Sequence, residues 1–319
     1  MSSKASITAY PEGIFAIDTE HVRKGLAAAH LVVHSCRTAF IDTGTALAVP
    51  LLLKALDQLQ LGYDSVDWLL LTHVHLDHAG GAGHLMRIFP KARAVVHPRG
   101  AAHLVNPTKL IAASISVYGA ENYAALYREL LPIPEDRVHI TRDGEFISLS
   151  GRLLEVLHTP GHALHHQAFF DYGSHSVFCG DTFGISYREF DVDGRAMILP
   201  TTTPTQFDPQ QLINSINRLL SIGPKAAYLT HYSRVDELPR LGADLKQQIR
   251  KFEEFALEQK GRTHIEAYNA IRAAIRTLWF SNAQRHGCTL TSAAIDSLLN
   301  NDLDLNTNGL LAWLARRRL

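Results

Sequence analysis

The stretch of sequence that decides the fold is Thr72-His73-Val74-His75-Leu76-Asp77-His78-Ala79-Gly80-Gly81. The apolar run over 66–71 that precedes it is typical of a buried strand, and the segment 83–89 that follows is typical of a short helix. Three histidines and one aspartate therefore lie on the turn that leaves a buried strand. Loops at strand ends, held by a rigid scaffold, commonly carry binding and catalytic groups.

The spacing of these residues indicates metal binding. His73 and His75 are two positions apart, so in an extended segment their imidazoles leave the same face and can hold one ion. Asp77 and His78 follow as the chain turns and face a second point close by. Imidazole with carboxylate suits zinc, iron, manganese or nickel. The alternative is a chance cluster in a chain with 18 histidines, but four matching positions between a strand and a helix disfavour it.

The pattern H-x-H-x-D-H after an apolar strand resembles the signature of the metallo-β-lactamase superfamily. Four further motifs of that family follow its order, each at an expected strand end: Asp42-Thr43-Gly44, Thr159-Pro160-Gly161-His162, Gly180-Asp181 and His231. The resemblance covers residues 7–235. It implies an α+β fold, a four-layer αββα sandwich, here with appended C-terminal helices.

The resemblance also implies two divalent metal ions as cofactors, with zinc favoured and iron or manganese as alternatives. Three imidazoles would hold the first ion, two imidazoles and a carboxylate the second, and another carboxylate would bridge both. The residues that match these roles are His73, His75 and His162 for the first ion, Asp77, His78 and His231 for the second, and Asp181 for the bridge.

Further residues are expected around the ions. Asp42 matches an aspartate that orients the histidine-rich loop from behind, although it could also be a helix N-cap, and His166 matches a histidine behind the ligands or on the substrate side. His165 stands where this family usually has glycine, so an extra imidazole would face the pocket. Phe183 and Tyr187 follow on a loop that lines the family's substrate pocket, with ordinary packing as the alternative.

The chemistry that the resemblance implies is hydrolysis of an ester, a lactone or a thioester by a hydroxide that bridges the two metals. Asp77 would pass a proton to the leaving group. Two alternatives stay open: an oxidoreductase similar to the persulfide dioxygenases, which use one iron, and a sensor or effector protein whose hydrolysis is incidental.

Two helical regions extend this pattern. Residues 101–131 are expected to be helical, either as a lid over the metal site or as a segment that packs on the sheet or forms a dimer contact. From residue 241 the sequence predicts four helices, at 245–259, 265–279, 290–299 and 310–317. The expected division is a catalytic domain over 1–240 and a helical extension over 241–319.

Composition limits the partners. Lys and Arg together number 31, as do Asp and Glu, so the net charge of zero gives no support for binding to nucleic acid or an anionic membrane. Three separated cysteines form no disulfide framework, and the first residues lack the apolar core of a signal peptide. We therefore expect a cytoplasmic protein that acts on a small molecule, with a homodimer as an open option.

Overall fold

The computed structural model describes residues 4–202 and 206–317. The chain forms two compact units, and each is considered by itself. The first comprises Met1–His158, His165–Gly180 and Ala227–Arg234, and the second comprises Thr159–Leu164, Asp181–Ala226 and Val235–Leu319. The domain boundary expected at residue 240 stays a prediction.

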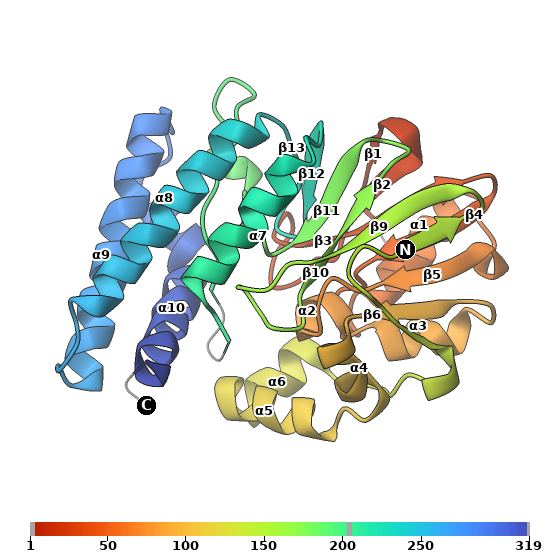
Figure 1. The fold of residues 1–319 in the computed structure, drawn as a ribbon, viewed down its shortest axis with the longest axis horizontal. Helices are drawn as coiled ribbons and strands as arrows, with labels where there is room; N and C mark the ends of the chain where they lie inside the picture. The colour runs from red at the N-terminus through yellow and green to blue at the C-terminus, as the bar shows by residue number, and fades with distance from the viewer. Residues whose placement is uncertain (1–3, 203–205, 318–319) are drawn as a thin grey trace. The chain divides into compact units, whose positions relative to one another are not determined.

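A seven-stranded sheet opens the first unit, and its strands follow one another in sequence order (Figure 1). The first four strands are antiparallel, and the last three join them in parallel. The strands are β1 (Ile7–Tyr10), β2 (Ile14–Asp18), β3 (Ala28–His34), β4 (Arg37–Ile41), β5 (Val66–Leu70), β6 (Arg93–Val96) and β7 (Val138–Ile140).

The second sheet has six strands in the order β13-β12-β11-β10-β9-β8. Its strands are β8 (Phe146–Leu149), β9 (Arg152–His158), β10 (Gln167–Asp171), β11 (Ser176–Gly180), β12 (Ala226–Leu229) and β13 (Ser233–Val235). Side chains of both sheets form one buried apolar cluster, to which Ile41 and Leu70 contribute from the first sheet and Val156 and Phe169 from the second. The two sheets therefore pack face to face.

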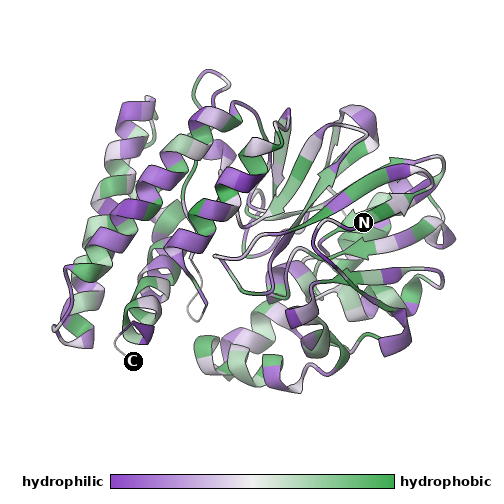
Figure 2. Ribbon diagram, viewed as in Figure 1, coloured by the Kyte–Doolittle hydropathy of each residue, from purple (hydrophilic) through white to green (hydrophobic). Residues whose placement is uncertain are grey.

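The other face of the first sheet is covered by helices. Because side chains alternate along a strand, the neighbours of Ile41 and Leu70, Phe40 and Leu69, point the opposite way, into a second apolar cluster. This cluster includes Leu85 and many residues from the helices α1 (Val49–Gln58), α3 (Ala82–Ile88) and α4 (Pro98–Val105). Burial on both faces explains why the central strands are mainly apolar, as the predominantly green strands in Figure 2 show.

The insertion expected at 101–131 forms three helices rather than one helical stretch: α4, α5 (Thr108–Tyr118) and α6 (Ala120–Tyr127). Pro107 precedes α5, and Gly119, at φ +79°, separates α5 from α6. Both residues interrupt a helix, the first because it lacks an N–H and the second through its positive φ. Tyr123 and Tyr127 of α6 pack with Leu76 of the histidine-rich loop.

The second unit is mainly helical. Its helices are α7 (Pro209–Ser221), α8 (Leu238–Leu257), α9 (His264–His286) and α10 (Ser292–Arg316). The expected break between 299 and 310 was wrong, because α10 is continuous. Polar residues in the expected gap are buried inside the unit: Asn306 accepts a hydrogen bond from the Thr202 backbone at 3.0 Å, and Asp302 accepts one from the Tyr187 hydroxyl. None of the described helices combines the length and apolar content that a membrane crossing requires.

Short single-turn helices complete both units. They are η1 (Pro11–Gly13), η2 (Tyr63–Ser65), η3 (Glu135–Arg137), η4 (Arg188–Phe190) and the four-residue α2 (Leu76–Ala79). Of these, α2 carries Asp77 and His78, two of the expected metal ligands.

One buried histidine predicts how stability depends on pH. Burial lowers the pKa of His30 to about 4, and the nearby Asp42 offsets this only in part. As the pH falls, His30 takes up a proton near pH 6.5 in the unfolded chain but only near pH 4 in the folded chain. The contribution of neutral His30 to the free energy of unfolding is therefore fully present above pH 6.5 and declines as the pH falls towards 4. Between these two pH values we expect the free energy of unfolding to fall less for His30→Gln than for the wild type. The difference between the two decreases is on the order of 2–3 kcal/mol.

Urea unfolding at several pH values would measure this difference in slope. His264→Gln, at an exposed histidine of α9, is the matched control. Equal slopes for the wild type and His30→Gln would show that His30 does not carry this pH dependence.

Candidate metal centre

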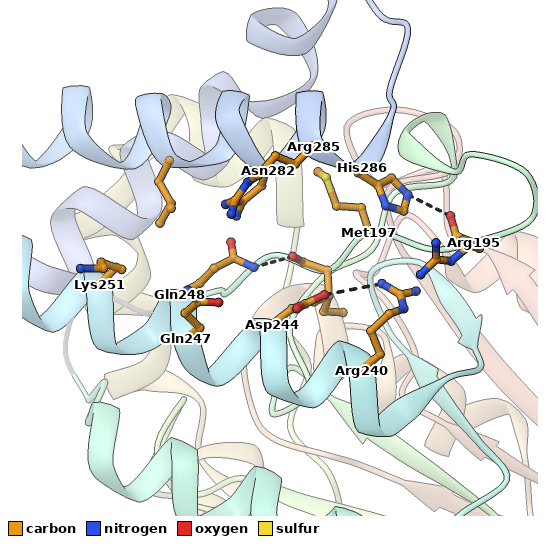
Figure 3. Close-up of a pocket in the computed structure, with 12 residues that line it drawn as sticks. Arg195, Met197, Arg240, Asp244, Gln247, Gln248, Lys251, Asn282, Arg285 and His286 are labelled. Carbon is orange, nitrogen blue, oxygen red and sulfur yellow. Dashed lines mark hydrogen bonds and ion pairs between the residues drawn. The ribbon is translucent and has the colours of Figure 1, made fainter.

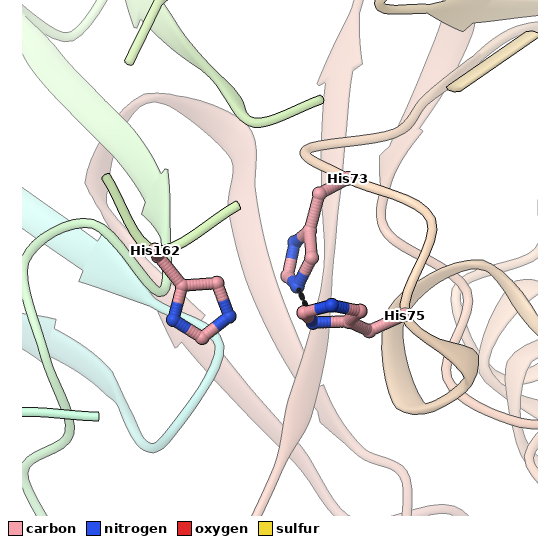
Figure 4. A group of neighbouring side chains, drawn as sticks. All are labelled: His73, His75 and His162. Atoms are coloured by element: carbon pink, nitrogen blue, oxygen red, sulfur yellow. Dashed lines mark hydrogen bonds between the residues drawn. The ribbon is translucent and has the colours of Figure 1, made fainter. Parts of the chain in front are cut away.

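The histidine-rich loop leaves the end of β5 and places His73 and His75 side by side. Nε2 of His73 lies 2.7 Å from Nδ1 of His75, and their rings meet edge to face with centroids 4.3 Å apart (Figure 4). The two imidazoles therefore converge, as their spacing predicts. His73 is buried, and its Nδ1 lies 3.1 Å from the hydroxyl of Thr72.

Asp77 and His78, which follow on α2, form a second group of possible metal ligands with His231. The ligand atoms of Asp77, His78 and His231 are all within 4.8 Å of one another. Asp77 Oδ2 is 3.6 Å from His78 Nε2 and 3.4 Å from His231 Nε2. Although burial raises the pKa of Asp77, His78 and His231 together outweigh it and hold the pKa well below its usual range. The carboxyl group is therefore ionised at neutral pH.

The buried carboxylate of Asp42, at the end of β4, holds this arrangement from behind. It accepts hydrogen bonds from the Thr72 backbone N–H at 2.8 Å and from the Thr72 hydroxyl. The Thr230 hydroxyl, next to His231, donates to it at 3.1 Å, and His78 Nδ1 lies 2.8 Å away. One side chain thus connects β4, the histidine-rich loop and the end of β12, and its role in orienting metal ligands stays a prediction.

In the second unit, His162 and Asp181 lie side by side. His162 Nε2 lies 3.2 Å from Asp181 Oδ2. The other ring nitrogen, Nδ1, lies 3.2 Å from the backbone oxygen of Thr201. Both side chains are buried, which is costly for such groups unless they are paired or bind a metal.

The donor set of these residues fits a divalent metal. A histidine that binds a metal through one nitrogen usually donates its other N–H to a carboxylate or a carbonyl, and that bond fixes the tautomer. Nδ1 of His78 faces Asp42, Nδ1 of His231 lies 2.9 Å from the oxygen of Leu26, and Nδ1 of His162 faces Thr201. In all three residues Nε2 is the nitrogen left for an ion, and in all three it lies next to an aspartate.

His165 and His166 both lie against the histidine-rich loop. The ring of His166 stacks on His73 with centroids 4.8 Å apart, whereas His165 lies edge to face with His75 at 5.5 Å. The His165 Nδ1 is at the limit of a hydrogen bond from the Val74 N–H, at 3.5 Å. The extra imidazole is therefore buried beside the loop.

The glycine of the Gly180-Asp181 motif has a steric reason. A Cβ at Gly180 would lie 2.6 Å from His166 Nε2 and 2.7 Å from the Thr72 hydroxyl oxygen, and its φ is +49°. We expect Gly180→Ala to lower the free energy of unfolding by about 1–3 kcal/mol and to reduce metal content, because Thr72 and His166 must move.

Gly144→Ala is the control for backbone strain alone. Gly144 also has a positive φ, of +77°, but among the described residues nothing lies within 4 Å of the position that a Cβ would take there. We expect that variant to lose about 1 kcal/mol. Equal losses in the two variants, with full metal content in both, would show that the contacts of Gly180 are unimportant.

The aromatic residues expected to line the substrate pocket are almost wholly buried in the second unit. Phe183 is 1% exposed and Tyr187 2% exposed. The Tyr187 hydroxyl donates to Asp302 of α10 at 3.1 Å. This contact favours the alternative of ordinary packing, and a substrate contact for either residue stays a prediction.

One further histidine near this group, His21, was not predicted from the sequence. It lies between β2 and β3. Burial is the main cause that lowers the pKa of His21. The charge of Asp77 raises this pKa, and the charges of His231 and His78 lower it further, so His21 lies near these three residues. Its ring is 5.8 Å from that of Tyr127 in α6. No motif surrounds His21 in the sequence, so only the fold reveals it.

The fold and this set of residues agree with the comparison to known proteins. The family model of the metallo-beta-lactamase superfamily matches residues 23–231. The chain therefore belongs to this superfamily, and the expected α+β sandwich with C-terminal helices is confirmed.

Two curated relatives illustrate the range of similarity. A metallo-beta-lactamase fold-containing protein of Sulfurisphaera tokodaii is 28% identical over 198 residues, which is 60% of this chain and 69% of that protein. A hydroxyacylglutathione hydrolase of Aeromonas hydrophila is 34% identical over 152 residues, which is 48% of this chain but only 44% of that enzyme.

Two solved structures share the fold. An archaeal metallo-beta-lactamase superfamily protein from Sulfolobus tokodaii has a TM-score of 0.63 at 20% identity, over 94% of this chain and 99% of that one. A metallo-beta-lactamase family protein from Thermus thermophilus has a TM-score of 0.63 at 21% identity, over 98% and 92% of the two chains. Both matches include the C-terminal region, because they span nearly the whole chain.

Proposed function

We propose that this protein is a hydrolase that uses two divalent metal ions to cleave a thioester, an ester or a lactone. The observation that carries the proposal is the shared arrangement of His78, His231 and His162. In each of these histidines Nδ1 lies next to a carboxylate or backbone carbonyl oxygen, and Nε2 lies next to an aspartate carboxylate. A structural histidine cluster gives no reason for this repeated orientation, whereas metal binding does.

The proposed ligands are those that the family resemblance implies. Two ions held by such a set would lower the pKa of a shared water to near 7 and polarise the scissile bond. We assign His73, His75 and His162 to the first ion, Asp77, His78 and His231 to the second, and Asp181 to both. Zinc is the ion that we propose first, with iron or manganese as alternatives.

Asp77 has a further role in the proposal. Because the pKa of its carboxyl group is held well below the usual range, Asp77 is ionised before the reaction and accepts a proton rather than supplying one. Any proton that it delivers to the leaving group must therefore first be taken up at its carboxylate from the attacking water. This order makes Asp77 a proton carrier between nucleophile and leaving group.

A thioester is the substrate class that we favour. The relatives named above include a hydroxyacylglutathione hydrolase, a name that denotes a thioester substrate, and a further relative, 26% identical over 173 residues, is an atrochrysone carboxyl ACP thioesterase of Aspergillus fumigatus. The match covers only 40% of the fungal protein. The neutral net charge argues against a polyanionic nucleic acid as substrate.

Metal analysis of protein purified without chelator, together with a panel of thioester, lactone, ester and phosphodiester substrates, tests the proposal. We expect about two ions per chain and turnover of at least one acyl substrate, which chelation abolishes and added metal restores. One iron per chain with oxygen uptake and no hydrolysis would replace the proposal by the dioxygenase alternative. Full metal content without turnover of any substrate would favour a sensor or effector.

A further inference from the structure

A cavity of about 430 Å³ lies in the second unit, and none of its lining residues is among those assigned to the metals. Figure 3 shows it between α8 and α9, beside the segment that carries Arg195 and Met197. Pockets for small organic ligands measure roughly 300–1,000 Å³. The volume thus suits a small organic molecule better than a bare inorganic ion.

Basic side chains dominate the charge of this cavity. Four of them line it, and Asp244 is the single carboxylate among the lining residues; the four are Arg195, Arg240, Lys251 and Arg285. Three of these four side chains form ion pairs with carboxylates. Glu237 lies 2.8 Å from Arg240 and 3.6 Å from Arg195, and Asp244 lies 3.5 Å from Arg240. Glu254 lies 2.6 Å from Lys251.

Arg285 differs from the other three. Its guanidinium donates to the side-chain oxygen of Asn282, and within the described ranges no carboxylate forms an ion pair with it. Both residues lie on α9 and reach the cavity (Figure 3). The guanidinium forms two parallel hydrogen bonds with a carboxylate or a phosphate, which are stronger than bonds to a neutral amide. Arg285 is exposed, so water solvates its guanidinium when no ligand is bound, and a carboxylate or phosphate at the cavity would replace that water.

Two polar atoms in the wall also have unused hydrogen-bonding capacity. Gln248 is 5% exposed and donates through Nε2 to the oxygen of Ile198 at 2.9 Å. Throughout 4–202 and 206–317, no donor reaches its buried Oε1, and no acceptor reaches the buried Nε of Arg240. A buried polar atom without a partner costs about 1–3 kcal/mol. A ligand towards which these two side chains turn would recover this loss.

We propose that this cavity binds a small organic anion, which carries a phosphate or carboxylate group, an apolar body and one hydrogen-bond donor. Arg285 binds the anionic group, with Arg240 Nε as a second donor, and Gln248 Oε1 accepts the ligand's hydrogen bond. Met197, Ile198 and Leu278 line the cavity with apolar surface that the body of the ligand covers. The site does not depend on the reaction proposed above.

Calorimetric titration of the purified full chain with its metals tests this site. The probes are 4-hydroxyphenyl phosphate and 4-hydroxybenzoate, which each carry an anionic group and a hydroxyl donor, and the neutral benzyl alcohol. We expect at least one anion to saturate at about one per chain, with an affinity that falls as salt is added, whereas benzyl alcohol does not bind. The anion that binds identifies the acidic group of the ligand.

Variants locate the binding. Arg285→Gln removes the cation, and Asn282→Asp adds a carboxylate of the same shape that occupies Arg285 in place of the ligand. We expect both to weaken the anion about tenfold. Arg250→Gln, at an exposed arginine of α8 that does not line the cavity, is the control and leaves binding unchanged.

Binding at the metals must be separated from binding at the cavity, since both attract anions. His75→Ala, in the other unit, is expected to leave anion binding intact. The proposal is overturned if neither anion saturates, if both Arg285→Gln and Asn282→Asp bind as well as the wild type, or if His75→Ala alone abolishes binding.

Discussion

Replacing His75 by alanine is expected to reduce turnover of the best acyl substrate by about a thousandfold while the fold is kept. His75 is only partly buried, and its Nδ1 lies beside another imidazole, that of His73, so its loss leaves little unfilled volume. The effect on the reaction is large because an electrostatic group aimed at the reacting centre contributes on the order of 10²–10³ in rate. The metal content per chain should fall in parallel.

Steady-state kinetics, metal analysis and thermal unfolding of the same preparation check this expectation. His103→Ala, at a partly buried histidine of α4, is the matched control and should keep both turnover and metal. Near-normal turnover in a folded His75→Ala with its full metal content would show that this imidazole is not a ligand.

Asp42→Asn is expected to have the largest effect on stability. The carboxylate receives hydrogen bonds from Thr72 and Thr230 and faces His78 Nδ1. An amide of the same shape presents an NH₂ group where an acceptor is needed, so at least one donor in this buried site loses its partner. We expect a loss of on the order of 2–4 kcal/mol in the free energy of unfolding. Metal affinity should fall by about 10–100-fold, because the orientation of His78 is no longer fixed.

Chemical unfolding of the metal-free and metal-loaded forms separates these two effects. Asp57→Asn, at an exposed aspartate of α1, is the control and should change neither quantity. A stable Asp42→Asn that binds metal normally would show that Asp42 is only a turn residue at the end of β4.

The sequence predicted those parts of the site that depend on local pattern. The apolar runs that end at Leu70, Gly180 and Leu229 identify buried strands, so the polar residues after them had to lie at strand ends. The close approach of His73 and His75 follows directly from a spacing of two in an extended segment. The family resemblance then supplied the expected role of each residue, and that assignment stays a prediction.

Residues that act through tertiary contacts left no such signal. Thr230 is one of many threonines until the fold brings its hydroxyl 3.1 Å from a carboxylate 188 positions earlier. His21 lies in a loop with no periodicity. Asn306 lies in the expected gap between two helices, and sequence cannot show that its side chain accepts a hydrogen bond from the Thr202 backbone inside the unit. In each case the deciding partner is remote in sequence.

The packing of Leu76 has a consequence for how the first unit moves. Leu76, Tyr123, Tyr127 and Leu130 form a small apolar cluster of their own, apart from the two clusters that bury the sheets. In α5 no described side chain is fully buried, and in α6 only Tyr123 and Tyr127 are, so few buried side chains hold these two helices in place. Segments of this kind open at a fraction of the global free energy of unfolding. The backbone amides of α5 and α6 should accordingly exchange with deuterium ahead of those in β4 and β5, and each opening uncovers Leu76, the residue next to Asp77.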